Sequence, residues 1–387
     1  MRQPIPYGKH QITDSDLQAV HKALQGDFIT QGEYIGEFEK QFAQYVDARF
    51  AVAVSNGTAA LHMAAMALGV NAKSKVITTP ITFVASANCV RYCGGEVVLA
   101  DIDPSTGLLD IKAVKALLEA APAGTYQGII PVDFAGYPID MEAFRTLADE
   151  FNLWIIEDAC HAPGGSFIDQ KGKVNYCGNG AYADLAIFSF HPVKHIACGE
   201  GGMITTNDPD LYHRLCQLRT HGITKDANQM KTSHGLWYYE MQDLGYNYRL
   251  TDFQAALGIS QLHRADAGIE RRRAIAQKYD EAFADTDLTL LRPESGFDHA
   301  YHLYIIQTEE RKQLYDDLRN KGIYCQVHYI PVHLMPYYQK QGYREGMFPH
   351  AEQYYQKCLS LPMYPGLTDK EQDYVIQSVK SLIPCNV

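Results

Sequence analysis

The chain has 387 residues, of which 46% are hydrophobic and 20% charged, and its formal net charge is -11. This length suggests two domains with ample core, the negative charge argues against broad binding to nucleic acid or anionic membranes, and no apolar run in the sequence is long enough to span a membrane. We therefore expect a cytoplasmic protein with reduced thiols and no bound metal, because its nine cysteines include no C-x-x-C pair and its fifteen histidines show no ligand spacing.

The first part of the chain is predicted to hold an extended arm, helices and a strand that leads through a turn into a further helix. The arm spans residues 4–8 and is of a kind that often crosses onto a neighbouring subunit. A helix capped at Thr13 ends near Leu24. A buried strand at 50–54 then reaches the turn at 55–57, whose sequence is Ser-Asn-Gly.

The helix that follows this turn is a candidate phosphate site. A strand that leads through a glycine turn into a helix presents free N–H groups and the positive end of the helix dipole at the carboxyl edge of a sheet. Thr58 and Ala59 are therefore candidate phosphate contacts. The alternative is that Thr58 is a plain N-cap.

Strands and helices then alternate, with strands expected at 75–79, 96–100, 128–132 and 153–156. This alternation predicts an α/β fold with a large, mostly parallel sheet between helices on both faces. Phe83 lies just past the end of the first of these strands, where its ring could stack on a flat cofactor. The alternative for this ring is a position in the core.

Asp158 lies at the carboxyl end of an apolar strand and is followed by a run that does not read as helix, Ala-Cys-His-Ala-Pro-Gly-Gly. A carboxylate buried there needs a cationic or protonated partner, because an unpaired buried charge is costly. A protonated pyridine nitrogen is such a partner.

Residues 188–202 carry the candidate nucleophile and read FSFHPVKHIACGEGG. A short strand runs into a polar turn with Lys194, and a glycine cluster leads into a second strand at 203–206. Glycine lets the backbone approach a bulky flat ligand closely, and a partly desolvated lysine has a lowered pKa, so that its free amine can attack a carbonyl. The alternative is a surface lysine in an ordinary β-hairpin.

The last third of the chain is predicted to form a smaller domain. A long helix from 253 to about 283, capped by Thr251 or Asp252, is long enough to bridge two domains. We therefore predict an N-terminal arm and large domain at 1–252, a bridging helix at 253–284 and a small C-terminal α/β domain at 285–387.

These signals converge on one cofactor. Pyridoxal phosphate carries a phosphate, a flat ring, a basic ring nitrogen and an aldehyde. The candidates at Thr58, Phe83, Asp158 and Lys194 match these four groups in chain order.

With these motifs the sequence resembles, over nearly its whole length, the DegT/DnrJ/EryC1 family of sugar aminotransferases, which have the type I aminotransferase fold. The matching stretches are SNGTAAL from Ser55, TPITFVASAN from Thr79, EDACHA from Glu157, FSFHPVK from Phe188, GEGG from Gly199 and LGYNYRLTD from Leu244.

The resemblance implies a role for individual residues. Lys194 would form the Schiff base with the cofactor, Asp158 would hold the pyridine nitrogen protonated, His161 would lie near the ring hydroxyl, and Phe83 would stack on the ring. Three residues would hold the cofactor phosphate: Thr58, Ala59 and Ser189.

The family resemblance also implies a homodimer with shared active sites. Asn247, and Arg249 less directly, would reach the cofactor phosphate of the neighbouring subunit. The weak candidates for contacts with the sugar nucleotide are Tyr7, Arg219, Arg249, His328 and His333.

Within the family, the chain is most similar to the transaminases of pseudaminic acid biosynthesis, chiefly through WYYEMQDLGYNYRLTD from Trp237. This similarity implies that L-glutamate donates an amino group to C4 of a UDP-linked 4-keto-6-deoxy-N-acetylhexosamine, in a ping-pong reaction. Three alternatives stay open: another UDP- or dTDP-ketosugar aminotransferase of the family, a sugar dehydratase, which the presence of Lys194 disfavours, and a non-catalytic sensor.

Overall fold

The computed structural model of the protein describes residues 3–383 and is built on a seven-stranded sheet with the strand order β2-β10-β9-β6-β5-β3-β4. Its strands are β2 (Phe50–Val54), β3 (Lys75–Thr78), β4 (Glu96–Leu99), β5 (Gly128–Ile130), β6 (Trp154–Asp158), β9 (Leu185–Ser189) and β10 (Gly202–Thr206). Neighbouring strands from β9 to β4 are parallel, whereas β10 is antiparallel to both β2 and β9. The predicted α/β fold with a mostly parallel sheet is confirmed.

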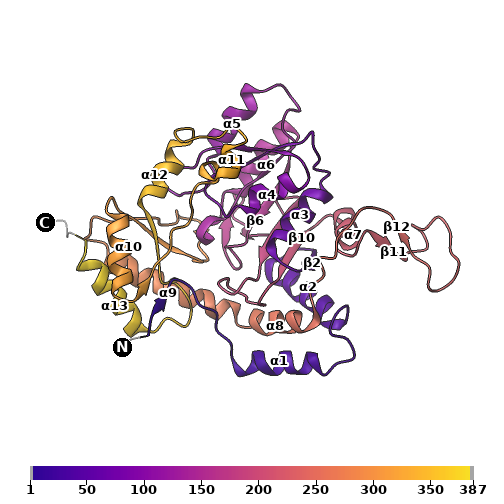
Figure 1. Cartoon of the computed structure of the whole chain (residues 1–387), viewed down its shortest axis with the longest axis horizontal. Coiled ribbons are helices and arrows are strands. Elements are labelled where there is room, and N and C mark those ends of the chain that lie inside the picture. The colour runs from indigo at the N-terminus through magenta and orange to yellow at the C-terminus, as the bar shows by residue number, and fades with distance from the viewer. Residues whose placement is uncertain (1–2, 384–387) are drawn as a thin grey trace.

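Helices cover both faces of this sheet (Figure 1). They are α2 (Glu33–Val46), α3 (Gly57–Ala67), α4 (Ala85–Tyr92), α5 (Ile111–Ala120), α6 (Met141–Phe151) and α7 (Pro209–Leu218), whereas α1 (Asp14–Leu24) packs against the later helix α8 (Asp252–Leu262). Alternate residues of β2 face opposite ways, because side chains in a strand alternate with a period of two. Val52 and Val54 pack in one core cluster with α3, and Ala51 and Ala53 pack in another with α2.

The C-terminal part has a hydrophobic core of its own, formed by residues 275–383 together with Ile5. The elements of this part are α9 (Ala265–Ala282), β13 (Thr289–Leu290), β14 (Phe297–Asp298), β15 (Tyr304–Gln307), α10 (Arg311–Asn320), β16 (Ile323–Tyr324), α11 (Pro336–Gln339), α12 (Pro349–Lys357), β17 (Cys358–Leu361) and α13 (Asp369–Lys380). The helix that precedes them, α8 (Asp252–Leu262), packs against α1 and α2. The predicted domain limits at 252/253 and 284/285 stay a prediction.

The predicted long helix is two helices, because the chain turns between α8 and α9. Arg264 has φ -121° and ψ 13°, outside the helical region. Its guanidinium binds the carboxylate of Asp16, whose side chain is fully buried, and the carbonyl oxygen of Gln11. This contact ties α1 to the junction of the two helices.

The first strand of the N-terminal arm pairs with a strand of the C-terminal part of the same chain, and a contact of the arm with a neighbouring subunit stays a prediction. β1 (Ile5–Pro6) lies parallel to β16, and the Ile5 N–H donates to the carbonyl oxygen of Gly322 at 2.9 Å. Tyr7 follows directly, and its carbonyl oxygen accepts from the Met363 N–H at 2.9 Å. The arm thereby brings the Tyr7 side chain beside the C-terminal part.

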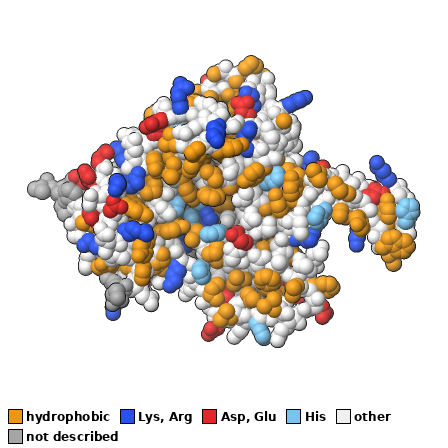
Figure 2. Space-filling model, in the orientation of Figure 1, with side chains coloured by type: hydrophobic (Ala, Val, Ile, Leu, Met, Phe, Trp, Pro, Cys, Tyr) orange, Lys and Arg blue, Asp and Glu red, His pale blue; other side chains and the backbone are white. Residues whose placement is uncertain are grey.

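A two-stranded hairpin, β11 (Ile223–Thr224) with β12 (Glu240–Met241), projects from the body beyond α7 (Figure 1). Figure 2 shows hydrophobic side chains gathered on this projection. The exposed apolar residues here are Leu236, Trp237, Tyr239, Met241 and Leu244. A separate small sheet joins β7 (Ser166–Ile168), β8 (Val174–Tyr176) and β14. Among the described residues, no helix has both the length and the apolar character needed to cross a membrane.

Candidate active site

A cavity of about 910 Å³ opens where the central strands end. The carboxyl ends of parallel strands are the usual place for a ligand in such a sheet, and this volume lies within the usual range for small-molecule pockets. The cavity brings together nine of the residues singled out from the sequence: Tyr7, Thr58, Ala59, Phe83, Asp158, His161, Ser189, Lys194 and His328.

One end of the cavity is formed by the first turn of α3. The N-cap is Asn56, whose side-chain oxygen accepts the Ala59 N–H at 2.8 Å, so Thr58 is not the cap. A Cβ on Gly57 would lie 2.9 Å from Cβ of Ser189 at the end of β9, which explains why only glycine fits here. Thr58 and Ser189 therefore lie on the two sides of a helix start that attracts anions.

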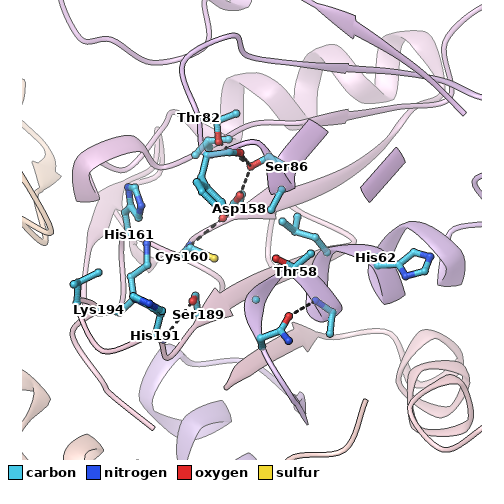
Figure 3. A pocket seen from close by; sticks show the side chains of 18 of the residues that line it. Thr58, His62, Thr82, Ser86, Asp158, Cys160, His161, Ser189, His191 and Lys194 are labelled. Atoms are coloured by element: carbon cyan, nitrogen blue, oxygen red, sulfur yellow. Dashed lines mark hydrogen bonds between the residues drawn. The ribbon is translucent and has the colours of Figure 1, made fainter. Parts of the chain in front are cut away.

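Asp158 is held at the end of β6 with only 5% of its surface exposed. Its Oδ2 accepts from the Ser86 hydroxyl at 2.6 Å, and its Oδ1 accepts from the Cys160 N–H at 3.2 Å (Figure 3). The Ser86 oxygen lies 2.8 Å from the Thr82 oxygen. The sequence analysis named neither Ser86 nor Thr82, although both lie in the stretch TPITFVASAN that marks the family.

Lys194 lies in a turn closed by its own N–H, which donates to the carbonyl oxygen of His191 at 2.8 Å. Burial of the ammonium lowers the pKa of Lys194, and the interactions with Cys160 and Asp158 oppose this only in part. A larger fraction of its amine is therefore uncharged than in an exposed lysine. β9 and β10 do form a β-hairpin, as the alternative interpretation of the sequence had it. Lys194 nevertheless lines the cavity and is not a surface lysine.

Histidines surround this amine, and Figure 2 shows histidine side chains gathered at a hollow near the centre of this face. The rings of His161 and His302 lie 4.3 Å apart, and the Tyr329 oxygen is 3.3 Å from Nε2 of His161. Burial first, and then the charge of Lys194, hold the pKa of His161, His302 and His328 below the usual histidine value. Sequence reasoning missed His302 and Tyr329, which line the cavity only because the C-terminal part folds over it.

Four sequence candidates lie outside the set of residues that lines the cavity. Arg219 forms an ion pair with Glu39 and donates to the carbonyl oxygen of Ala53 at 2.8 Å. His333 is completely buried, and its Nε2 lies 2.9 Å from a carboxylate oxygen of Glu352. Their local partners, rather than a sugar nucleotide, account for both side chains.

The two remaining candidates come from the segment just before α8. Asn247 is exposed and its backbone bridges to Thr220, while Arg249 is half-buried. Neither side chain lines the cavity of the described chain.

Behind Asp158 the structure brings together three buried groups that the sequence analysis, which expected no metal site, did not connect. Ligand atoms of Asp133, Glu157 and Cys177 lie within 4.8 Å of one another. Burial raises the pKa of Asp133 to about 7, and burial together with the charge of Asp133 raises the pKa of Glu157. Protonation of these carboxyl groups limits the negative charge near Asp158.

The side chains in the cavity fit pyridoxal phosphate. The helix start suits a phosphate, the Lys194 amine suits an aldehyde, and Asp158 suits a protonated ring nitrogen. Phe83 lines the cavity with 57% of its surface exposed, so its ring offers an apolar face to a flat ligand. This exposure argues against the alternative that Phe83 is a core residue.

Comparisons with known proteins agree with this geometry. The profile of the DegT/DnrJ/EryC1/StrS aminotransferase family matches residues 10–380. The spore coat polysaccharide biosynthesis protein SpsC of Bacillus subtilis is 39% identical, with 98% of this chain and 97% of SpsC covered. A UDP-4-amino-4,6-dideoxy-N-acetyl-beta-L-altrosamine transaminase of Campylobacter jejuni is 34% identical, with the same coverage of the two chains.

Solved structures show the same relationship. Helicobacter pylori PseC, an aminotransferase involved in the biosynthesis of pseudoaminic acid, superposes with a TM-score of 0.87 at 29% identity, covering 98% of this chain and 99% of PseC. The putative sugar aminotransferase Spr1654 of Streptococcus pneumoniae, in its pyridoxal phosphate form, has a TM-score of 0.88 at 28% identity and covers 98% of each chain. The chain therefore belongs to the DegT/DnrJ/EryC1/StrS family, whose members are sugar aminotransferases that use pyridoxal phosphate.

Proposed function

We propose that the protein moves the amino group of L-glutamate to C4 of a UDP-linked 4-keto-6-deoxy-N-acetylhexosamine and gives UDP-4-amino-4,6-dideoxy-N-acetyl-β-L-altrosamine for pseudaminic acid biosynthesis. The observation that carries the reaction type is the meeting of Lys194 and Asp158 in one cavity. The Campylobacter relatives named for this product, at 34% identity, and the likeness to PseC support the choice of sugar.

In this proposal the residues of the cavity divide the work between binding and proton transfer. Pyridoxal phosphate, when bound, supplies an electron sink for bond breaking at the carbon that carries the amino group. The Nζ of Lys194, kept partly uncharged by burial, would remove a proton from that carbon and deliver it to the cofactor carbon that carried the aldehyde, and it would run the same transfer in reverse when the sugar is aminated. Asp158 holds a proton on the ring nitrogen, and Phe83 orients the ring.

The other proposed contacts with the cofactor and the sugar are based on where each side chain lies in the cavity. Thr58, Ala59 and Ser189 would hold the phosphate at the start of α3, although the Ala59 N–H already donates to Asn56. His161 would lie beside the ring hydroxyl. Tyr7 and His328, whose rings lie 5.2 Å apart at the edge of the cavity, remain our candidates for sugar contacts.

A second candidate is another nucleotide-sugar aminotransferase of the same family. SpsC, at 39% identity, is named for spore coat polysaccharide biosynthesis rather than for the altrosamine product. A ketosugar of different configuration, or amination at C3 instead of C4, would use the same Lys194 and Asp158 chemistry.

The spectrum of the loaded protein separates these possibilities. The protein is incubated with pyridoxal phosphate, the visible band of the lysine-bound cofactor is recorded, and L-glutamate and then one ketosugar are added. Loss of the band with glutamate and its return with the UDP-linked 4-keto-6-deoxy sugar support the proposal. Return only with a dTDP-linked or 3-keto sugar favours the second candidate, and absence of any band contradicts the cofactor assignment at Lys194.

We also propose that the protein acts as a homodimer in which Asn247, assisted by Arg249, completes the phosphate site of the partner. The exposure of Asn247 and the apolar side chains on the projecting β11–β12 hairpin support this arrangement. A monomer would leave that apolar surface in water.

Mixing two inactive variants tests the shared site. A Lys194→Ala subunit retains Asn247, and an Asn247→Ala subunit retains Lys194, so a hybrid dimer contains one complete site. After joint refolding we expect activity of up to about a quarter of wild type, because random pairing makes half of the dimers hybrid. Mixtures no more active than the separate variants would contradict the shared site, and sedimentation velocity would show directly whether dimers form.

A further inference from the structure

We propose that Ser86, with Thr82 behind it, is a positioning residue that fixes the carboxylate of Asp158 for its contact with the cofactor ring nitrogen. This inference rests on the proposed function, because it assigns Asp158 to that nitrogen. The three side chains form one line of polar groups at the wall of the cavity (Figure 3). Ser86 and Thr82 would act on the reaction only through Asp158.

The number of hydroxyl protons determines which group donates and which accepts along this line. The Ser86 oxygen lies 2.6 Å from Asp158 Oδ2, 2.8 Å from the Thr82 oxygen and 3.4 Å from the carbonyl oxygen of Phe83. A hydroxyl has one proton to donate, and an ionised carboxylate can only accept. The Ser86 proton therefore goes to Asp158, the shortest of the three contacts, and Thr82 donates its own proton to Ser86.

The line is buried and links the start of a helix to the central sheet. Thr82, Ser86 and Asp158 expose 3%, 1% and 5% of their surface. Ser86 lies in the first turn of α4, and Asp158 ends β6 in the middle of the central sheet. Hydrogen bonds at a low local dielectric are stronger than bonds in water, so this contact holds the carboxylate more firmly than an exposed serine could.

The second carboxylate oxygen is held as well. Oδ1 of Asp158 accepts from the Cys160 N–H at 3.2 Å, two residues further along the chain. With one donor on each oxygen, the carboxylate cannot rotate without losing a hydrogen bond. Each oxygen has two acceptor sites, so both keep a site for a protonated ring nitrogen. Loss of the Ser86 hydroxyl removes the shorter of these two bonds, while the longer bond from the Cys160 N–H stays.

The experiment uses full-length protein loaded with pyridoxal phosphate labelled with ¹⁵N in the ring, and it needs only L-glutamate. We expect Ser86→Ala to slow the glutamate half-reaction about 10- to 100-fold, as misplacement of a reacting group does. The ¹⁵N shift should move toward that of the unprotonated ring. Ser86→Thr, which keeps a hydroxyl, should have nearly the wild-type rate and the wild-type ¹⁵N shift. Ser378→Ala, a buried serine of α13 that lies outside the cavity, is the matched control and should leave both unchanged.

A double-mutant cycle shows whether Ser86 works through Asp158. In an Asp158→Ala background we expect Ser86→Ala to have no further effect on the rate. Should Ser86→Ala disturb folding, Thr82→Val provides the second variant, with a smaller loss in the same direction that disappears in the Asp158→Ala background. An additive loss, or an unchanged ¹⁵N shift in Ser86→Ala, would overturn the inference. Wild-type protein without a cofactor band would instead contradict the proposed function.

Discussion

The backbone N–H of Ala135 donates to Nδ1 of His161 at 3.2 Å. A backbone amide can only donate, so Nδ1 carries no proton. Burial, and then the charge of Lys194, hold the pKa of His161 well below its ordinary value, which keeps the ring neutral. Its proton is therefore on Nε2, which faces the Tyr329 oxygen at 3.3 Å. Tyr329 accepts this bond, and its own hydroxyl proton is available to a ligand in the cavity.

This relationship predicts a single ring form for His161. We expect ¹⁵N NMR of histidine-labelled protein, assigned with a His161→Gln variant, to show a neutral ring protonated on Nε2 from pH 6 to pH 8. An imidazolium signal from His161 within that range, or a ring protonated on Nδ1, would contradict the assigned direction of the bond to Tyr329.

We predict that the protein loses stability in mild acid because several of its histidines are buried. Burial, assisted by the charge of Arg273, lowers the pKa of His299 to about 3. Below a pH of about 6.5 the unfolded chain binds a proton at this residue and the folded chain does not, so the free energy of unfolding falls as pH falls. His299 alone accounts for about 2 kcal/mol between pH 7 and pH 5.

Urea unfolding of wild type and His299→Gln at the two pH values measures this contribution. We expect the variant to lose about 2 kcal/mol less than wild type between pH 7 and pH 5. Asp133 works in the opposite direction, because its raised pKa of about 7 favours the folded protein at low pH. The contribution of Asp133 is the same in wild type and in the variant, so it cancels when the two proteins are compared. Equal losses in the two proteins would show that His299 is not the source.

Gly202, the first residue of β10, lies against the turn that precedes α3, and we predict that this position requires glycine. A Cβ there would lie 2.6 Å from the carbonyl carbon and oxygen of Asn56, which are backbone atoms that cannot move aside. We expect Gly202→Ala to lower the free energy of unfolding by about 1–3 kcal/mol, the usual cost of overpacking, and to weaken binding of pyridoxal phosphate. Chemical unfolding and a spectroscopic titration with the cofactor measure the two effects.

The control makes the same substitution where there is space. Gly36 lies within α2, and a Cβ there would meet no atom within 4 Å. Gly36→Ala should raise the free energy of unfolding by about 0.5–1 kcal/mol, because alanine is the better helix former, and should leave cofactor binding unchanged. A Gly202→Ala protein that binds the cofactor as tightly as wild type would show that the phosphate end tolerates movement.

Lys194 is predicted to be the site of covalent attachment of the cofactor. After incubation with pyridoxal phosphate and reduction with borohydride, mass spectrometry should find the added mass on the peptide that contains Lys194. Lys194→Ala should lack this adduct and lose turnover by at least about 1000-fold, since it lacks both the attachment site and the base. An adduct on another lysine, or wild-type turnover in the variant, would refute the assignment.

The sequence predicted those site residues that follow a strand directly. Asp158 is the last residue of a strand, Thr58 and Lys194 come shortly after one, and a parallel sheet places such positions along one edge. Ser86 could not be found in this way, because it is separated by 72 positions from Asp158 and meets it only when α4 packs against the sheet. Tyr329 needs the C-terminal part in place before it lines the cavity.

Charge alone was a poor guide to the ligand-binding residues. Arg219 was a candidate contact for the sugar nucleotide, but it forms an ion pair with Glu39, which is 180 positions away in the chain. The break between α8 and α9 was missed for a similar reason. Propensities in that stretch favour one continuous helix, while the turn at Arg264 depends on Asp16, a residue of α1.

The pairing of β1 with β16 bears on how the polypeptide is made. Ile5 leaves the ribosome roughly 320 residues before its partner Ile323, which at about 5–20 residues per second is a wait of about 15–60 s. Throughout that time the apolar side chain of Ile5 lacks the core that buries it. The last part of the nascent chain thus cannot complete its own interior without the first residues, so proteolytic loss of this short arm during synthesis would leave the finished C-terminal core with a gap.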